Sequence, residues 1–319
     1  PPPPPPPPPR LDSSAASDVY KRQDEYGQGS YADVIRGIDW IVANRDTYGI
    51  RVLNLSFGAP LYSYYWDDPM NQAVMAAWQA GIVVVVAAGN EGPDKVTVGA
   101  PANLPHVVTV GAMTDNETPT DLSDDQVAWF SSLGPTIENH IKPDLIAPGG
   151  RVLGIMDFFA QIALEHPELH DGELHFTMSG TSQATAVVSG VAALILQESP
   201  NLSPDDVKCR LMVSARPFVD AEGNLAYSAF QQGTGVVDAY DAVYSTETGC
   251  ANRGLDIAKD LSGEAHSVGP AEQDAEGDFT IEEWEGREIS SDFANWVKFG
   301  NWMKSITDAS VAINRWVTD

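Results

Sequence analysis

The chain has 319 residues, 43% of them hydrophobic, which allows a substantial buried core and excludes an intrinsically disordered protein. Its 45 acidic residues outnumber its 18 basic ones, and the net charge of -27 argues against nucleic acid or an anionic membrane as a partner. No apolar run reaches the roughly 18 residues of a membrane-spanning helix. We therefore expect an acidic, soluble monomer without a membrane span.

The first 23 residues do not read as natural protein sequence. Nine prolines precede Arg10, and residues 13–23 resemble an in-frame translation of a sequencing adapter. A proline-rich ligand for a recognition domain is the alternative interpretation. We set residues 1–23 aside as a non-native leader and expect the natural sequence to begin near Asp24, in the middle of a gene.

Helical and strand-like patterns then alternate along the chain. Apolar residues recur at helical spacing over 30–45, and Gly81 stops a second helix before a valine-rich strand. The predicted strands cover 51–57, 82–88 and 107–113, and the predicted helices cover 30–45, 71–79, 182–197, 203–214 and 237–244. Continuous apolar strands that alternate with helices indicate an α/β fold whose mostly parallel sheet is covered on both faces.

The composition changes beyond about Thr246. Nine acidic residues lie between Glu272 and Asp292, against the single basic Arg287. The same region carries Trp284, Trp296, Trp302 and Trp316. We expect residues 24–245 to form one domain and residues 246–319 to form a separate or peripheral acidic region of unknown role, with aromatic side chains that pack on the domain.

The cysteines and histidines are weak indicators of disulfide bonds and metal sites. Cys209 and Cys250 could form one disulfide or none, and a buried free thiol is the favoured interpretation of Cys209 because it lies in a predicted helix. The spacing of His166 and His170 would suit a metal on a helix, but Pro167 between them breaks that geometry. We therefore expect surface histidines, and no metal ligand set is identifiable.

Four motifs carry the chemistry. They are V-L-N-L-S-F-G over 52–58, V-V-V-A-A-G-N-E-G-P over 84–93, K-P-D-L-I-A-P-G over 142–149 and S-G-T-S-Q-A-T-A over 179–186. The last places Ser182 at a helix start, where free backbone N–H groups favour a developing negative charge. Asn90 follows a buried strand, where an amide without a partner would be costly, although an ordinary turn also explains Asn-Glu-Gly-Pro.

In this order, the motifs resemble the subtilisin-like serine peptidases, the subtilase family, over about residues 24–244. The resemblance implies a subtilisin-like three-layer fold that lacks its amino-terminal strands and helices in this sequence. It implies that Ser182 is the nucleophile and that the Asn90 amide joins the Ser182 backbone N–H in an oxyanion hole. It also implies an extended-peptide groove between two walls, formed by Ser56, Phe57 and Gly58 and by Ala87, Ala88 and Gly89.

The family's aspartate and histidine motifs, D-[ST]-G and H-G-T-x-V-A-G, are absent from this sequence. His175 lies only seven residues before Ser182, but on an expected strand that does not aim it at the serine. We therefore expect a serine-type endopeptidase acting on peptides or proteins, of which the chain as given is nearly inactive. The resemblance also implies an extracytoplasmic or secreted location and calcium as a family cofactor, without identifying calcium ligands here.

Two alternatives remain at this point. A non-catalytic relative could have kept the peptide groove as a binding module. A sedolisin-type carboxyl-serine peptidase shares the Gly-Thr-Ser turn but uses a glutamate base and an oxyanion aspartate, and Asn90 argues against it.

Overall fold

The computed structural model describes residues 29–118, 120–220, 225–275, 277–281 and 315–317, with side chains described only up to residue 281. The expected leader, Trp284, Trp296 and Trp302 lie outside these residues. The elements are α1 (Tyr31–Tyr48), β1 (Val52–Leu55), α2 (Pro69–Gln79), β2 (Val83–Ala87), β3 (Val108–Thr114), β4 (Gln126–Val127), β5 (Leu145–Pro148), β6 (Val152–Ile155), α3 (Gln161–Glu165), the 3-10 helix η1 (Pro167–Leu169), β7 (His175–Met178), α4 (Thr181–Glu198), α5 (Pro204–Ser214), α6 (Ala229–Gln232), α7 (Ala239–Tyr244), α8 (Ile257–Ser262), β8 (His266–Val268), β9 (Ala271–Gln273), β10 (Phe279–Ile281) and β11 (Arg315–Val317).

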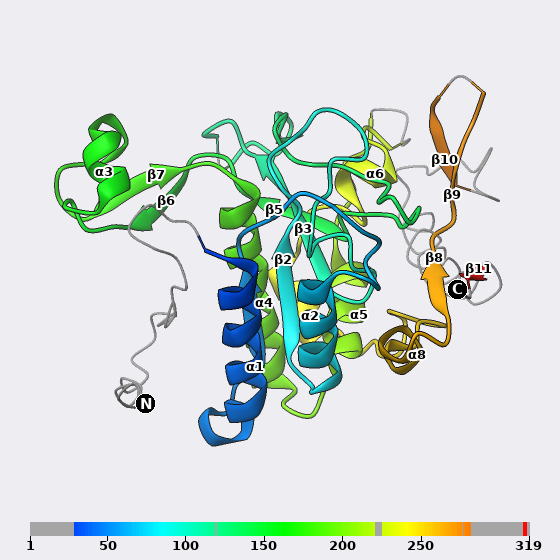
Figure 1. Ribbon diagram of the computed structural model, residues 1–319. Coiled ribbons are helices and arrows are strands. Elements are labelled where there is room, and N and C mark those ends of the chain that lie inside the picture. The colour runs from blue at the N-terminus through cyan, green and yellow to red at the C-terminus, as the bar shows by residue number, and fades with distance from the viewer. Residues whose placement is uncertain (1–28, 119, 221–224, 276, 282–314, 318–319) are drawn as a thin grey trace.

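A mostly parallel sheet forms the centre of the molecule (Figure 1). β1 pairs with β2, β2 with β3 and β3 with β5, all in parallel, and β4 adds a short antiparallel pairing at the end of β3. Because the four longer strands run in the same direction, their carboxyl ends meet at one edge of the sheet. The α/β fold expected from the sequence is confirmed.

Helices cover the sheet on both faces, as the valine-rich strand requires. All five residues of β2 are buried, so neither face of this strand contacts water. The long helix α4 packs along β1, β2, β3 and β5, while α2 packs on β2 with α1 beside it (Figure 1). The result is a three-layer arrangement in which α4 crosses most of the sheet.

Local signals explain where the main helices begin. Ser30 caps α1 by accepting a hydrogen bond from the Asp33 backbone N–H, and Ser203 forms a capping box with Asp206 at the start of α5. The second helix starts at Pro69, two residues before its predicted start, because the Asp68 carboxylate caps it.

The chain after α7 packs against the domain. Cys250 forms a disulfide with Cys209 of α5, with a Cα–Cα distance of 5.2 Å. The interpretation of Cys209 as a free thiol was therefore wrong, because the chain returns to α5 after α7 and brings the two cysteines together. Further along, β8 pairs with β11, whose Trp316 is described only through its backbone. The domain boundary at residue 245 stays a prediction.

Four of the six histidines are buried, so the expectation of surface positions was wrong. They are His106, His140, His170 and His266. Burial lowers the pKa of His140 to about 3 and holds the pKa of His106 well below its usual value. Both rings are therefore neutral at pH 7, and a neutral imidazole is far less costly to bury than a charged one.

Within the described ranges, no helix combines the length and the apolar character that crossing a bilayer requires.

Candidate active site

Ser182 lies in the first turn of α4, beside the carboxyl end of β1. Its Oγ donates a hydrogen bond to the Ser56 carbonyl oxygen at 3.1 Å, and the Ser56 Oγ donates in return to the Ser182 carbonyl oxygen at 3.0 Å. The side chain is half-buried. This reciprocal pair fixes the start of the helix against the strand and leaves the serine accessible.

Asn90 is held by the residue that precedes Ser182. Its Oδ1 accepts hydrogen bonds from the Thr181 backbone N–H at 2.9 Å and from the Thr181 hydroxyl at 3.1 Å. The Thr181 Oγ1 in turn accepts from the Gly89 backbone N–H at 3.2 Å. Asn90 itself is exposed, so the expectation that burial would make its amide costly was wrong. Its position depends on Thr181, which is fully buried.

Two donors are available next to the Ser182 hydroxyl. With both Oδ1 bonds made to Thr181, the Asn90 Nδ2 is free to donate to a bound group. The Ser182 backbone N–H lies in the first turn of α4, where no carbonyl of the helix can accept from it. This arrangement can stabilise negative charge on an oxygen bound beside Ser182.

The six predicted groove residues follow two neighbouring strands. Leu55 pairs with Val86, so the residues that continue β1 and β2 lie opposite one another at the carboxyl edge. Ser56 and Phe57 are half-buried and Gly58 is exposed, whereas Ala87 and Ala88 are buried in the sheet and Gly89 is half-buried. The arrangement brings all six to the edge that carries Ser182, and their contact with a peptide stays a prediction.

Two supports of this edge were not anticipated from the sequence. Gly89 has a φ of +112°, and a Cβ there would lie 2.7 Å from the Ser132 Oγ, which accepts from the Glu91 backbone N–H. Gly149 accepts from the Gly180 backbone N–H at 2.8 Å, and a Cβ on Gly149 would lie 2.8 Å from the Gly180 oxygen. Thr181 lies inside the S-G-T-S motif and could have been found there, but no local pattern marks Ser132.

No histidine is hydrogen-bonded to Ser182, although all six lie within the described residues. His175 Nδ1 contacts Asp171 Oδ2 at 2.7 Å, and His170 Nε2 contacts the Met156 carbonyl oxygen at 3.2 Å. The others contact Glu168, Ser267 or Asp260. The described part of the chain thus presents a candidate nucleophile and oxyanion donors without a general base.

A second polar region, here called the buried ionic cluster, comprises Lys142, Asp144 and Lys208. It lies at the amino ends of β3 and β5, the edge of the sheet opposite Ser182. Lys142 Nζ donates to Asp144 Oδ2 at 2.7 Å, and Lys208 Nζ lies 3.1 Å from Asp144 Oδ1. Burial lowers the pKa of Lys142 to about 7. Burial opposes ionisation of Asp144, but the two lysines hold its pKa below the usual value.

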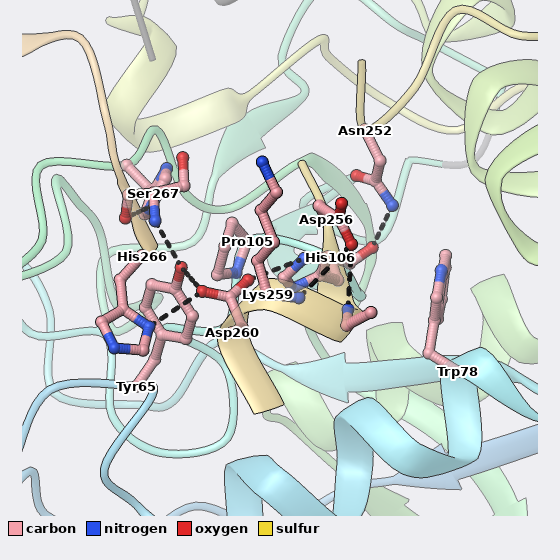
Figure 2. Close-up of polar contacts among 12 residues, drawn as sticks. Tyr65, Trp78, Pro105, His106, Asn252, Asp256, Lys259, Asp260, His266 and Ser267 are labelled. Carbon is pink, nitrogen blue, oxygen red and sulfur yellow. Dashed lines mark hydrogen bonds and ion pairs between the residues drawn. The ribbon is translucent and has the colours of Figure 1, made fainter. Parts of the chain in front are cut away.

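Next to this cluster, Asp260 of α8 reaches into the domain (Figure 2). Its Oδ1 accepts from the Tyr65 hydroxyl at 2.9 Å and lies 3.2 Å from His266 Nδ1. Its Oδ2 lies 3.4 Å from His106 Nε2. Burial raises the pKa of Asp260, while the Tyr65 and His266 contacts oppose that rise. These contacts join the segment after α7 to the core.

A cleft of about 790 Å³ lies on the same side, lined by residues of α1, α2 and α5 and of the segment around α8. His106 and Trp78 line it, but none of the eight predicted site residues does. This cleft is therefore separate from the edge that carries the candidate nucleophile.

The described residues contain no cluster of His, Cys, Asp and Glu side chains that could hold a metal ion. Across residues 29–281, within the described ranges, no group of three or more His, Cys, Asp or Glu side chains could hold an ion. In particular, His166 and His170 are separated by η1 and do not converge.

Comparison with known proteins places the site in context. The model of the subtilase family matches residues 16–237. The chain is 40% identical over 225 residues to the serine protease AprX of Bacillus subtilis, which covers 69% of this chain and 49% of the relative. It is 34% identical over 197 residues to subtilisin DY of Bacillus licheniformis, covering 61% of this chain and 59% of that protein.

Solved structures agree with these relatives. The patellamide maturation protease PatA matches with a TM-score of 0.52 at 30% identity, covering 69% of this chain and 70% of that one. Fervidolysin from Fervidobacterium pennivorans, a keratinolytic enzyme, matches with a TM-score of 0.51 at 29% identity. The match covers 67% of this chain and 29% of that one. The chain thus spans about half the length of AprX and less than two thirds of subtilisin DY.

Proposed function

Because the chain belongs to the subtilase family, we propose that it is the nucleophile-bearing part of a serine endopeptidase that hydrolyses peptide bonds. The observation that carries this proposal is the set of hydrogen bonds that connects Ser56, Asn90, Thr181 and Ser182. Two hydrogen bonds tie Asn90 to the residue before Ser182, and two more tie Ser182 to the end of the neighbouring strand.

In this proposal, the Ser182 Oγ attacks the carbonyl carbon of the scissile bond and its proton passes to a histidine base. The oxygen that becomes negative accepts hydrogen bonds from Asn90 Nδ2 and the Ser182 backbone N–H. The C–N bond then breaks as the amine takes the proton, and water hydrolyses the acyl-serine. The histidine and its orienting aspartate belong to motifs that this sequence does not contain.

The chain as given is therefore proposed to be nearly inactive. Oxyanion donors and binding alone leave about 1000- to 10000-fold acceleration over water, far below a complete peptidase. A fluorophosphonate probe should accordingly give little labelling of Ser182 in residues 1–319.

The decisive test uses the protein extended upstream in its gene. We expect that sequence to contain D-[ST]-G and H-G-T motifs, and the extended protein to hydrolyse a short fluorogenic peptide. Ser182→Ala should remove at least about 1000-fold of kcat. Asn90→Ala should lower kcat about 100- to 1000-fold, a magnitude measured in this family rather than calculated from this structure.

The matched control is Gln197→Ala near the other end of the same helix, where the side chain is exposed. It should leave kcat unchanged. Hydrolysis that survives Ser182→Ala would contradict the proposal. An upstream sequence without both motifs would favour the alternative, a non-catalytic relative that binds peptides in the same groove.

We further propose that the protein is a monomer with peptide or protein substrates and works in a secreted or extracytoplasmic location. The disulfide between Cys209 and Cys250 supports an oxidising compartment. Calcium, which the family resemblance implies, has no side-chain ligand set among the described residues, and no step of the mechanism uses it.

A further inference from the structure

Residues 150–178 form a projection, here called the β6–β7 arm, that extends from the body of the molecule (Figure 1). Its two strands pair in antiparallel fashion, with Leu153 opposite Thr177 and Ile155 opposite His175. Because side chains alternate along a strand, these four residues share one face, and Phe176 lies on the other.

The Phe176 face has a small core of its own. Phe176 is 2% exposed and Ala163 of α3 is 1% exposed. The ring of His170 lies 6.2 Å from that of Phe176, and its Nε2 lies 3.2 Å from the Met156 carbonyl oxygen. α3 and η1 therefore cover this face, so the arm is an ordered unit with one face already packed.

The opposite face of the arm exposes two apolar side chains beside the polar Thr177 and His175. Leu153 is 61% exposed and Ile155 is 77% exposed. The arm contributes eight of the twenty exposed large hydrophobic side chains of the described residues. Leu153 and Ile155 lie on this face, and the other six lie in α3, η1 and the loops around them, namely Phe158, Phe159, Ile162, Leu164, Leu169 and Leu174. Such a concentration of exposed apolar surface marks an interaction site. Among the described strands, β6 pairs only with β7, which leaves its other edge open to an added strand.

The base of the arm is bonded directly to the turn that carries Ser182. The Arg151 backbone N–H donates to the Ser179 Oγ at 2.8 Å, and the Gly180 backbone N–H donates to the Gly149 carbonyl oxygen at 2.8 Å. A chain that crosses the Ser182 edge and continues past this turn would therefore meet the arm.

The charge of the arm indicates which kind of chain would bind. Its ionised side chains are Arg151, which is paired with Glu117, and five exposed acidic residues, Asp157, Glu165, Glu168, Asp171 and Glu173. A second copy of this acidic arm, or an anionic lipid surface, would be repelled, whereas lysine and arginine would be attracted.

We propose that the uncovered face of the β6–β7 arm is an exosite that binds an extended apolar segment, flanked by basic residues, of the protein substrate being cleaved at Ser182. Main-chain hydrogen bonds to the open edge of β6 and apolar contacts with Leu153 and Ile155 hold the segment. The substrate part of this inference rests on the proposed peptidase function.

The first test measures binding without catalysis, using the full chain with Ser182→Ala. The probe is a labelled peptide of alternating valine and threonine with lysine pairs at both ends, followed by fluorescence anisotropy. Adding Leu153→Thr and Ile155→Thr, which keeps strand-forming residues at exposed positions, should weaken binding by at least about 10-fold. Ile137→Thr, at a site 40% exposed in the loop before the amino end of β5, is the matched control and should change nothing.

Several outcomes would overturn the proposal. Equal binding by the arm variant would do so, as would equal binding of a peptide with glutamate in place of lysine. Self-association of the parent chain that the arm substitutions abolish would assign the surface to a second copy instead. A photoreactive version of the peptide should crosslink to residues 152–155 or 174–178, and crosslinks confined elsewhere would contradict the exosite.

The second test separates this inference from the peptidase proposal, using the upstream-extended protein. The arm substitutions should raise KM about 10-fold for a long substrate containing the apolar-basic segment. They should leave kcat/KM for a short peptide unchanged, and an equal loss on both substrates would contradict the exosite. If no variant cleaves either substrate, the peptidase proposal fails and the anisotropy experiment alone decides the peptide site.

Discussion

At the carboxyl ends of β1 and β2, the polar side chains of the candidate site are neutral and three of the four are at least partly exposed, whereas at the amino ends of β3 and β5 the polar side chains are charged and buried. Ser56, Asn90, Thr181 and Ser182 position one another through hydroxyl, amide and main-chain hydrogen bonds. The buried ionic cluster instead sets two lysines around Asp144. The buried groups His106, His140 and Lys142, whose pKa values burial lowers strongly, lie in and around the cluster and not beside Ser182.

This contrast shows that a shifted pKa is not by itself a sign of catalysis. Perturbed titrating groups gather at active sites, but buried structural networks perturb them as well. Here the network links the ends of two strands, α5 and the segment around α8. If the contrast is correct, substitutions in the buried ionic cluster should mainly lower the free energy of unfolding. Substitutions around Ser182 and Asn90 should mainly disturb the positions of these two side chains.

Asp144→Ala should have the largest effect on stability. The substitution leaves the Lys142 and Lys208 amines buried without their carboxylate partner. Removing one partner of a buried ion pair lowers the free energy of unfolding by about 3 to 5 kcal/mol. Urea unfolding followed by circular dichroism would measure it. Asp46→Ala, at a side chain 91% exposed, is the control and should have little effect. A loss no larger than that of the control would mean that the cluster does not stabilise the fold.

Gly89→Ala, at the carboxyl end of β2, should lower the free energy of unfolding by about 2 to 3 kcal/mol. The residue has a φ of +112°, and the new Cβ would meet the Ser132 Oγ at 2.7 Å. Gly190→Ala is the matched control within this chain, because nothing lies within 4 Å of its Cβ position and alanine favours a helix. The same urea titration should show a gain for the control, and equal effects would refute the role assigned to Gly89.

His140→Gln should flatten the dependence of stability on pH. The unfolded ring titrates near 6.5 and the folded ring near 3, so below about pH 6.5 the unfolded state takes up a proton that the folded state does not. His140 therefore removes about 2 kcal/mol of stability as the pH falls from 7.5 to 5. Unfolding at both pH values should show a loss about 2 kcal/mol smaller in His140→Gln than in the parent chain or in the exposed-site control His166→Gln, because His106, whose pKa burial also lowers, still contributes.

Thr181→Val should have the smallest effect, and mainly on turnover. It removes the hydroxyl that holds Asn90 Oδ1 and accepts from Gly89, while Thr181→Ser keeps both contacts. In the upstream-extended protein, we expect kcat to fall about 10-fold with KM unchanged, equivalent to about 1.4 kcal/mol. Full activity in the valine variant, or equal loss in the serine variant, would mean that Thr181 does not position the amide.

Much of the fold could be predicted because its signals are local. The valine run of β2, the glycine after α2 and the cap at Ser203 each mark an element within a few residues. The start of α2 was misplaced because the Asp68-Pro69 signal precedes the apolar pattern that marked the helix. Ser182 and Asn90 could be proposed as site residues because each lies in a short motif. The structure brings the two residues to one edge of the sheet, and their roles stay predictions.

The rest could not be predicted because it depends on contacts between distant segments. Nothing near His106 in the sequence indicates that Asp260 will reach it, and Ser132 supports Gly89 from more than forty positions away. The pairing of Cys209 with Cys250 likewise required knowing that the chain returns to α5. The burial of Asn90 was misjudged because its strand is buried while the residue itself lies beyond the strand end.

The reach of Asp260 into the domain has a practical consequence for anyone preparing a shorter version of this protein. A chain ended at residue 245, where the composition changes, would lose the carboxylate that meets Tyr65 and His106, the ring of His266 stacked on Trp66, and the disulfide partner of Cys209. Such a product should expose aromatic surface and aggregate on expression. Trimming should therefore spare residues 246–281.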